Sequence, residues 1–279
     1  MNALVQEIVA TKVRAGSLAV WWLGQEGFAL KTSMLTVYID PYLSTYAERI
    51  TAGKPNEHVR MTPAPMQPED VTNADLILCT HDHADHIDPD GIPQIAQASP
   101  QAKFIIPECA KSTLRNMDIA EEKIHTLRGD DSLDCIGFTI SALPAKHEQF
   151  DKDEKHGYPY LSYVINAEGL TLLHAGDTIP YDGQVERAKP FGVDVVFLPI
   201  NGRDEDRHRL EFEGNFTCGE AVEFAQAIDA KLTIPMHYDM FTLNTADVRE
   251  FCQIAKSQGL NYRVLGTAQR VTLTKETLQ

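Results

Sequence analysis

The sequence lacks any long apolar run, and this absence argues against a membrane-spanning protein. No segment approaches the roughly 18 consecutive apolar residues that a membrane span needs. The first sixteen residues mix apolar and charged side chains and do not have the basic-then-apolar layout of an export signal. We therefore expect a cytoplasmic protein with no membrane partner.

Cysteine and positive charge are also scarce. The five cysteines are odd in number and have no CxxC spacing, which fits neither a disulfide framework nor a thiolate metal site. The 25 Lys and Arg residues are outnumbered by 40 Asp and Glu residues, so the formal net charge is −15. Such an acidic chain is a poor candidate for binding nucleic acid, and we expect no nucleic-acid partner. An anionic substrate would need a local positive site.

The pattern of apolar residues predicts an α/β fold. The 279 residues, of which 43% are hydrophobic, can bury a substantial core, and we expect one domain spanning residues 1–279. A Pro-rich stretch at 53–70 predicts a surface excursion that could act as a lid. Helices are predicted at 217–228, where Thr217 and Glu220 form a capping-box pattern, and at 246–257. Compact apolar runs predict strands at 18–23, 27–31, 35–39, 74–80, 103–107, 138–144, 161–166, 170–177, 193–200 and 231–237.

The run from His81 to His86 directly follows one of these predicted strands. Residues two apart in an extended segment project to the same side, so His81 and His83 can converge on one cation. After a bend, Asp85 and His86 can reach another. The alternative is a polar loop that caps a helix through Asp85 or Asp88. Crowding so many titratable groups without a cation is costly, so a metal site is the favoured interpretation.

This run resembles the HxHxDH motif of the metallo-β-lactamase superfamily. The resemblance implies an αββα sandwich, with two packed β-sheets flanked by helices. It also implies that His147 in ALPAKHEQ, Asp177 in LLHAGDT and His237 in TIPMHYD complete the site. By this resemblance His81, His83 and His147 would hold one metal ion, Asp85, His86 and His237 the other, and Asp177 would bridge both.

Two of the three later residues have an ordinary interpretation as well. His147 alone would more often be a polar histidine, and Asp177 after Gly176 could be a turn or helix-cap residue. His174 is better interpreted as a hydrogen-bonded strand histidine than as a support for the ligands. Cys218 is left out of the ligand set because it falls in the first turn of a predicted helix. The ordered set of matches favours the metal roles.

The chain most resembles the cytoplasmic UlaG-like branch of the superfamily, the L-ascorbate-6-phosphate lactonases and their relatives. The stretches that carry this similarity are WWLGQEGFAL, YIDPYLS, THDHADHIDP, PAKHE, HAGDT, FLPINGRD, GNFTCGEAVEFA and IPMHYDMFTLN. His83 stands where related oxygen-reducing diiron proteins carry a glutamate, which favours hydrolysis over redox chemistry. The resemblance implies hydrolysis of a small anionic lactone such as L-ascorbate 6-phosphate.

The expected cofactors are two divalent metal ions, zinc or manganese first, with iron also compatible with His and Asp ligands. A water shared by the ions would attack the lactone carbonyl, and Asp85 would act catalytically by orienting it or by passing a proton to the leaving alkoxide. The alternative within enzymes is a phosphodiesterase or phospholipase-like hydrolase. A metal-binding or regulatory protein without turnover is the alternative from another class. A homo-oligomer is compatible with the sequence.

The anion of such a substrate needs a cationic partner, and a run of arginines offers one. Guanidinium groups make bidentate contacts with phosphates and carboxylates, so Arg203, Arg207 and Arg209 are the substrate-binding candidates. The competing interpretation is a solvated loop in which these arginines pair with Asp204, Glu205 and Asp206. Charge runs of this kind are common on surfaces, and this interpretation is slightly favoured.

Overall fold

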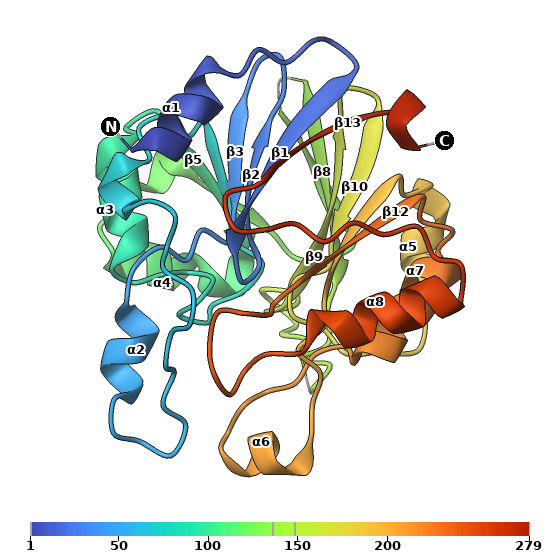
Figure 1. The fold of residues 1–279 in the computed structure, drawn as a ribbon. Coiled ribbons are helices and arrows are strands. Elements are labelled where there is room, and N and C mark those ends of the chain that lie inside the picture. Colours follow the sequence, from blue (N-terminus) through green and yellow to red (C-terminus); the bar gives the residue numbers. More distant parts are fainter. Residues whose placement is uncertain (1, 136, 148, 279) are drawn as a thin grey trace.

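Two facing β-sheets form the centre of the computed structural model, which describes residues 2–135, 137–147 and 149–278 (Figure 1). The larger sheet has seven strands within this part of the chain, in the order β13 (Arg270–Thr274), β1 (Ser17–Gly24), β2 (Gly27–Lys31), β3 (Thr36–Ile39), β4 (Leu76–Leu78), β5 (Lys103–Pro107) and β6 (Ile124–Leu127). The other has six, in the order β12 (Leu232–Met236), β11 (Val195–Pro199), β10 (Leu170–His174), β9 (Leu161–Ala167), β8 (Phe138–Pro144) and β7 (Asp131–Cys135).

Helices cover the outer faces of both sheets (Figure 1). α1 (Ala3–Ala10), α3 (Gly91–Ala98) and α4 (Lys111–Asn116) pack against the first sheet through apolar side chains such as Val5, Ile92 and Leu114. α5 (Gln184–Ala188), α7 (Cys218–Ala227) and α8 (Val248–Ser257) lie on the side of the second sheet. The predicted αββα sandwich is confirmed. Short helices also lie in connecting segments: α2 (Tyr46–Thr51), α6 (Glu205–Arg209), and the 3₁₀ turns Pro68–Asp70, Glu108–Ala110, Glu121–Lys123, Lys189–Phe191 and Glu276–Leu278.

The core between the sheets is formed by side chains that alternate along the strands. Val20 and Trp22 of β1 belong to the same buried cluster as Ile140 of β8. Phe28 of β2 reaches across to Phe197 of β11, with ring centroids 4.5 Å apart. Strand alternation sends every second side chain to one face of a sheet, so this packing fixes which residues face the core and which face the outer helices.

Strand direction determines where the loops of the sandwich meet. β1, β2 and β3 form the predicted antiparallel meander. β3, β4 and β5 are parallel, and β10, β11 and β12 are parallel in the other sheet. The carboxyl ends of parallel strands meet at one edge of their sheet, which is where α/β proteins place ligand sites. The polar runs that follow β4, β10 and β12 therefore emerge together.

The capping box predicted for α7 is present. The Glu220 backbone N–H donates to Thr217 Oγ1 at 3.3 Å, and the Thr217 N–H donates to Glu220 Oε2 at 2.9 Å. These two bonds satisfy backbone donors that a helix start otherwise leaves unpaired. α7 begins one residue inside the predicted range for that reason.

The Pro-rich stretch 53–70 is irregular apart from the turn Pro68–Asp70, as predicted for a surface excursion. Arg60 anchors it, because Arg60 Nε donates to Glu48 Oε1 at 2.6 Å and Nη2 donates to the Ser44 carbonyl at 2.8 Å. Arg60 also pairs with Phe241 in an isolated β-bridge. The lid role proposed for this stretch remains a prediction.

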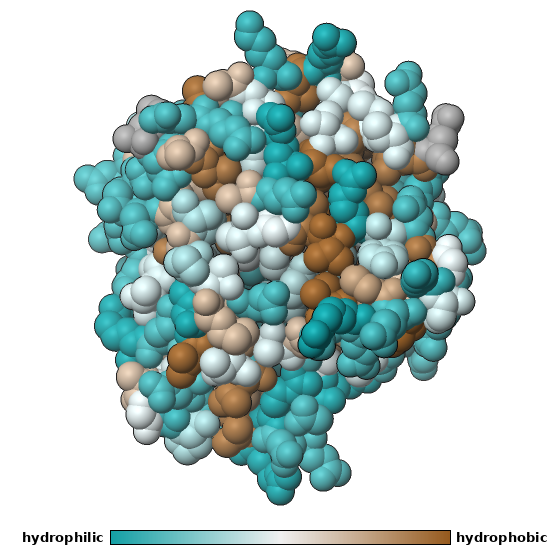
Figure 2. All heavy atoms as spheres, in the orientation of Figure 1, coloured by the Kyte–Doolittle hydropathy of each residue, from teal (hydrophilic) through white to brown (hydrophobic). Residues whose placement is uncertain are grey.

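Among the described residues, no helix has the length and apolar character needed to cross a membrane. Hydrophilic residues dominate the outline of the molecule, and apolar residues form smaller groups near the centre of the face shown in Figure 2. This surface agrees with a chain in which 23% of residues are charged.

Candidate metal centre

The seven predicted ligands come together at one edge of the sandwich, where loops from both sheets meet. The loop after β4 supplies His81, His83, Asp85 and His86, and the segments after β8, β10 and β12 supply the other three. Their donor atoms fall into two sets, within each of which all atoms lie within 4.8 Å of one another. The first set is His81, His83, His147 and Asp177, and the second is Asp85, His86 and His237.

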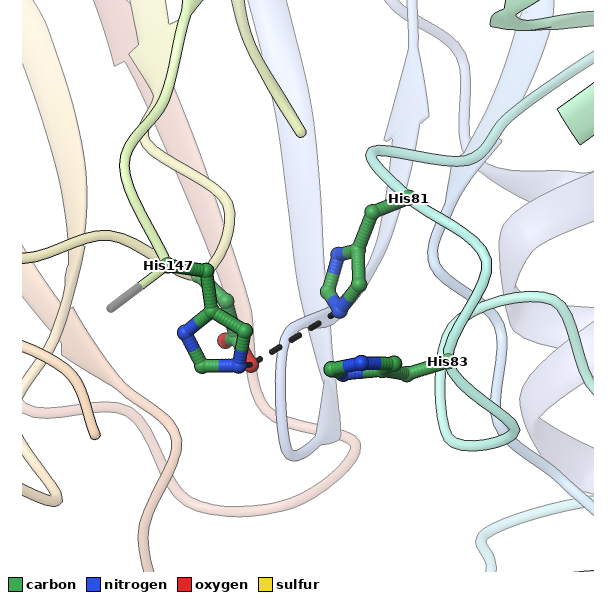
Figure 3. A group of neighbouring side chains, drawn as sticks. His81, His83 and His147 are labelled. Atoms are coloured by element: carbon green, nitrogen blue, oxygen red, sulfur yellow. Dashed lines mark ion pairs between the residues drawn. The ribbon is translucent and has the colours of Figure 1, made fainter. Parts of the chain in front are cut away.

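Asp177 lies between the two sets. Its Oδ2 is 3.4 Å from His147 Nε2 and 3.8 Å from His81 Nε2 on one side, and 3.7 Å from His86 Nε2 on the other. Its Oδ1 is 3.3 Å from His237 Nε2. Figure 3 shows His81, His83 and His147 pointing toward one another from two separate loops. This arrangement is the one expected of a carboxylate shared by two cations.

Local backbone geometry explains how one short loop serves both sets. The N–H groups of His86 and Ile87 donate to the His83 carbonyl at 3.0 and 2.8 Å, which folds the chain back after His83. His81 and His83 therefore belong to the first set, whereas Asp85 and His86 belong to the second.

A glycine is required immediately before Asp177. Gly176 has a φ of 62°, and a Cβ placed there would lie 2.8 Å from the Leu161 carbonyl and 3.0 Å from Thr80 Cβ. Both the left-handed backbone and the close approach exclude larger residues without a local shift. Gly176 thus lets the chain turn at the end of β10 and present the Asp177 carboxylate.

The second ring nitrogen of three histidines is held by a hydrogen bond. His81 Nδ1 donates to Thr80 Oγ1 at 3.0 Å, and His147 Nδ1 donates to the Gly214 carbonyl at 3.1 Å. His86 Nδ1 donates to Asp40 Oδ2 at 2.9 Å. Such bonds fix the ring orientation, so that each of the three rings directs Nε2 toward the cluster.

Asp40 is a site residue that the sequence reasoning missed. It is fully buried and accepts hydrogen bonds from the Thr80 N–H and Thr80 Oγ1, at 2.8 and 2.7 Å, as well as from His86. Its φ is 41°, an uncommon left-handed conformation for a non-glycine residue. The sequence feature that could have identified Asp40 is its position directly after β3, in the YIDP run.

We expect Asp40→Asn to lower metal affinity by about 10–100-fold, the usual cost of losing an outer partner of a ligating histidine. The amide no longer holds His86 through a charged acceptor, while the loops keep their length and packing. Competition of the purified variant with a chelator measures the affinity. Asp75→Asn is the matched control, because Asp75 also accepts a backbone N–H, from Thr36 at 2.8 Å, outside the ligand sets. Unchanged affinity in Asp40→Asn would contradict the orienting role.

The donor atoms of the cluster fit a divalent cation. His81 Nε2, His86 Nε2 and Asp177 Oδ1 are buried and have no hydrogen-bond partner among the described residues. Buried polar atoms are normally satisfied, and leaving several unpaired in one place is costly. Imidazole nitrogens and carboxylate oxygens suit zinc, manganese or iron(II). The arrangement of these residues is therefore that of a metal centre.

The electrostatics of the cluster also favour cation binding. Burial, with nearby His86 and His83, holds the pKa of His81 well below its ordinary value, and burial lowers the pKa of His147 to about 4. Both rings are therefore neutral and able to bind a metal at neutral pH. Burial alone would lower the pKa of His86, but carboxylates led by Asp85 raise it to about 10. A metal ion bound there must displace a proton, as metal binding to titratable ligands generally does.

A cavity of about 290 Å³ opens onto the ligands. His58 from the Pro-rich stretch, Ile50 and Phe212 form part of its wall, and Glu211 and Glu213 also line it. Glu213 Oε2 lies 3.2 Å from His147 Nε2 and 3.4 Å from His83 Nε2. Sequence reasoning missed this glutamate, since it lies in a loop far along the chain from the histidines it contacts.

The three candidate arginines are engaged in ion pairs. Arg203 Nη2 lies 2.6 Å from Glu220 Oε1, Arg207 Nε lies 2.6 Å from Asp204 Oδ2, and Arg209 pairs with Asp206. None of these arginines is among the described residues that line the cavity. Their role in binding a substrate anion remains a prediction, and the pairs with Asp204 and Asp206 match the competing interpretation.

Two further residues discussed from the sequence have clear positions. Cys218 is buried in the first turn of α7, where its Sγ donates to the Ile200 carbonyl at 3.8 Å, outside both ligand sets. His174 is a hydrogen-bonded strand histidine: Nε2 donates to the Glu26 carbonyl at 2.9 Å, and Nδ1 accepts from the Gly176 N–H at 3.3 Å. His174 thereby ties the β1–β2 turn to the loop that carries Asp177.

The αββα sandwich and the His/Asp cluster at its edge together define a metal-dependent hydrolase. A family model described as "Beta-lactamase superfamily domain" matches residues 36–238, and the chain belongs to that superfamily. A UPF0173 metal-dependent hydrolase of Archaeoglobus fulgidus is 31% identical over 256 residues, which cover 89% of this chain and 95% of the relative.

Two further proteins are similar to this chain. Igni18, a metallo hydrolase of Ignicoccus hospitalis, has a structure that superposes with a TM-score of 0.67 at 22% identity, covering 92% of this chain and 98% of that one. This likeness supports the fold. N-acyl-phosphatidylethanolamine-hydrolyzing phospholipase D 1 of Caenorhabditis elegans is 26% identical, covering 81% of this chain and 65% of the relative.

Proposed function

We propose that this protein hydrolyses a small lactone with two divalent metal ions, as a member of the UlaG-like branch of the superfamily. The observation that carries the proposal is the position of the Asp177 carboxylate between two sets of ligands, with Oδ2 facing His147 and His86 and Oδ1 facing His237. His81, His83, His147 and Asp177 would hold one ion, and Asp85, His86, His237 and the shared Asp177 the other. Zinc and manganese are the candidates, and iron is also compatible with these ligands.

When bound, the ions supply a water of lowered pKa and polarise the carbonyl of the substrate. The protein's own contribution is positioning and proton transfer. Asp85 is well placed for the second role, because its Oδ2 lies 3.8 Å from His86 Nε2 and accepts from Gln25 Nε2 at 2.9 Å. Although burial opposes it, the neighbouring His86 lowers the pKa of Asp85, so it is a carboxylate that can take a proton from the nucleophile and pass it to the leaving alkoxide.

The cavity wall favours a small substrate with an apolar body. Ile50 and Phe212 line it, and the ring of Tyr160 packs beside the ligands with its centroid 5.2 Å from that of His81 and 5.3 Å from that of His147. Ligand cavities commonly combine such apolar walls with a few polar groups that orient the reacting end. A lactone ring would contact this wall with its apolar face and turn its carbonyl toward the ligand cluster.

The charge of the site favours a lactone without a phosphate. The ligand sets themselves contain two aspartates, Asp85 and Asp177, which alone would leave a site with two divalent ions positive. Glu26, Glu213 and Asp40 add three further carboxylates in contact with the ligand sets, so the negative charges at least balance those of two divalent ions. Of the described residues that line the cavity, none is a lysine or an arginine. A phosphate would approach Glu211 and Glu213 without a cationic side chain beside it.

We expect the metal-loaded enzyme to hydrolyse an unphosphorylated lactone with a kcat/KM at least about tenfold higher than its phosphorylated counterpart. Tenfold corresponds to about 1.4 kcal/mol, which is well within the repulsion between like charges a few ångströms apart near a protein surface. L-Ascorbate and L-ascorbate 6-phosphate form a suitable matched pair. A preference for the phosphorylated compound would restore the phosphorylated substrate, and Arg203→Ala should then raise KM.

The phosphodiesterase or phospholipase-like alternative is favoured by one observation, the similarity to the C. elegans phospholipase D. The same assay tests it if a simple phosphodiester is included. No lactone turnover together with clear phosphodiester cleavage would move the function to this alternative. A protein that retains two ions and turns over none of these compounds would be a metal-binding protein without hydrolytic activity.

A further inference from the structure

Glu26 is a buried carboxyl group for which the proposed reaction has no use. It lies between β1 and β2, its side chain is fully buried, and neither Oε1 nor Oε2 accepts a hydrogen bond from an N–H or hydroxyl donor among the described residues. Buried carboxylates nearly always accept several hydrogen bonds or pair with a cation, because an isolated one is very costly. The surroundings of Glu26 should therefore reveal what balances it.

The groups around Glu26 are themselves acceptors or metal-ligand candidates. Its donor atom lies with those of Asp177 and His237 in one group whose atoms are all within 4.8 Å of one another, and with those of Asp40 and His174 in another. Glu26 Oε2 is 4.0 Å from His86 Nδ1, which already donates to Asp40. Among the described residues, no lysine or arginine forms an ion pair with the Glu26 carboxylate.

The backbone holds this side chain in place from two sides. The Glu26 carbonyl accepts from His174 Nε2 at 2.9 Å, and the carbonyl of Gln25 accepts from the His237 N–H at 2.9 Å. Gln25 has a φ of 51° and His237 one of 60°, both in the left-handed region. Uncommon backbone conformations on both sides of one contact are maintained only when the surroundings require them. The β1–β2 turn therefore holds Glu26 beside the predicted ligands Asp177 and His237.

We propose that Glu26 is a ligand of the second metal ion, beside Asp85, His86 and His237. This inference rests on the proposed dinuclear site and extends it. With Glu26 and the shared Asp177, the second site offers three carboxylates and two imidazoles, whereas the first offers three imidazoles and one carboxylate. Carboxylate-rich sites suit harder ions such as manganese, and imidazole-rich sites suit zinc. The second site therefore prefers a manganese-type ion.

The test is metal binding by Glu26→Gln, which keeps the size of the side chain and removes its charge. We expect the affinity for Mn²⁺ at the second site to fall more than about 100-fold, beyond the range for outer partners, while zinc at the first site is retained. Chelator competition and elemental analysis give these values without an activity assay. The visible spectrum of the cobalt-loaded protein should also change, because it reports the ligands of the ion.

Glu168→Gln is the matched control, since Glu168 accepts hydrogen bonds from Ser33 and Gly16 and belongs to neither ligand set. Wild-type manganese affinity and an unchanged cobalt spectrum in Glu26→Gln would overturn the proposal and leave Glu26 a buried structural acid. Fewer than two ions in the wild-type protein would instead count against the dinuclear site itself.

A direct observation covers the case in which Glu26→Gln does not fold. A crystal structure of the manganese-loaded wild-type protein, with the ions located by anomalous scattering, should place a Glu26 oxygen within direct coordination distance of one ion, close to the roughly 2.0–2.2 Å of carboxylate oxygens on zinc. A distance beyond hydrogen-bond range of both ions would overturn the proposal.

Discussion

Asp177→Ala is expected to lose both metal ions and all measurable hydrolysis. Its two carboxylate oxygens face nitrogens of both ligand sets, so one substitution removes a donor from each. It also removes the negative charge that separates the cations. The loss of kcat/KM should far exceed the roughly 10–100-fold typical of an outer partner. Elemental analysis after gel filtration, together with lactone assays at saturating metal, measures both effects.

Asp182→Ala provides the control for Asp177→Ala, because Asp182 is exposed and lies five residues further along the same loop. It should retain the metal content and turnover of the wild-type protein. Retention of two tightly bound ions by Asp177→Ala would show that the carboxylate is not shared between them.

His147→Ala and His237→Ala are expected to lose activity through different metal ions. His147 belongs to the first ligand set and His237 to the second, so each variant should retain close to one ion per chain. Loss of a direct ligand normally lowers metal affinity or activity by more than the roughly 10–100-fold found when a residue that supports a ligand is lost. Both variants should fold, since each side chain follows the end of a strand and leaves β8 and β12 intact. Metal analysis, circular dichroism and lactone assays together test this.

His156→Ala is the matched control for these two variants. His156 is half-exposed and pairs with Asp153, 2.9 Å away, outside both ligand sets. Its substitution should leave metal content unchanged. Turnover at the wild-type rate in either His147→Ala or His237→Ala would mean that the ligand set has been assigned to the wrong histidines.

The sequence predicts the central part of this site well because its signals are local. His81, His83, Asp85 and His86 lie within six residues, and a strand followed by a polar loop is recognisable without tertiary information. The apolar runs that become β8, β10 and β12 also locate the segments that carry the later ligands. The strands missed by pattern reasoning are less apolar. β7 has alternating exposed and half-buried residues, including two aspartates, and it forms only because β8 pairs with it.

The residues that surround the ligands could not be predicted in the same way. Glu26 lies in a turn whose pattern indicates only a tight connection between strands, and its contacts are made with residues about 150 and 210 positions away. Asp40 likewise depends on its position beside His86. The arginine run shows a similar limit of prediction from sequence. Asp204 and Asp206 can be recognised as partners because they are neighbours in the sequence. The pairing of Arg203 with Glu220 cannot, because it requires the start of α7 to lie beside the loop.

The ligands come from both layers of the sandwich, and this has a consequence for how the molecule is assembled. The loop after β4 belongs to one sheet, whereas the segments with His147, Asp177 and His237 belong to the other. A pair of bound ions would therefore connect the two layers at this edge, in addition to hydrogen bonds such as those from His174 to the Glu26 carbonyl and from the His237 N–H to the Gln25 carbonyl. Metal ions that bind only the folded state increase the free energy of unfolding, by an amount that grows with the logarithm of the free ion concentration divided by Kd. The supply of metal in the cell would then govern how long the native chain persists as well as how fast it works.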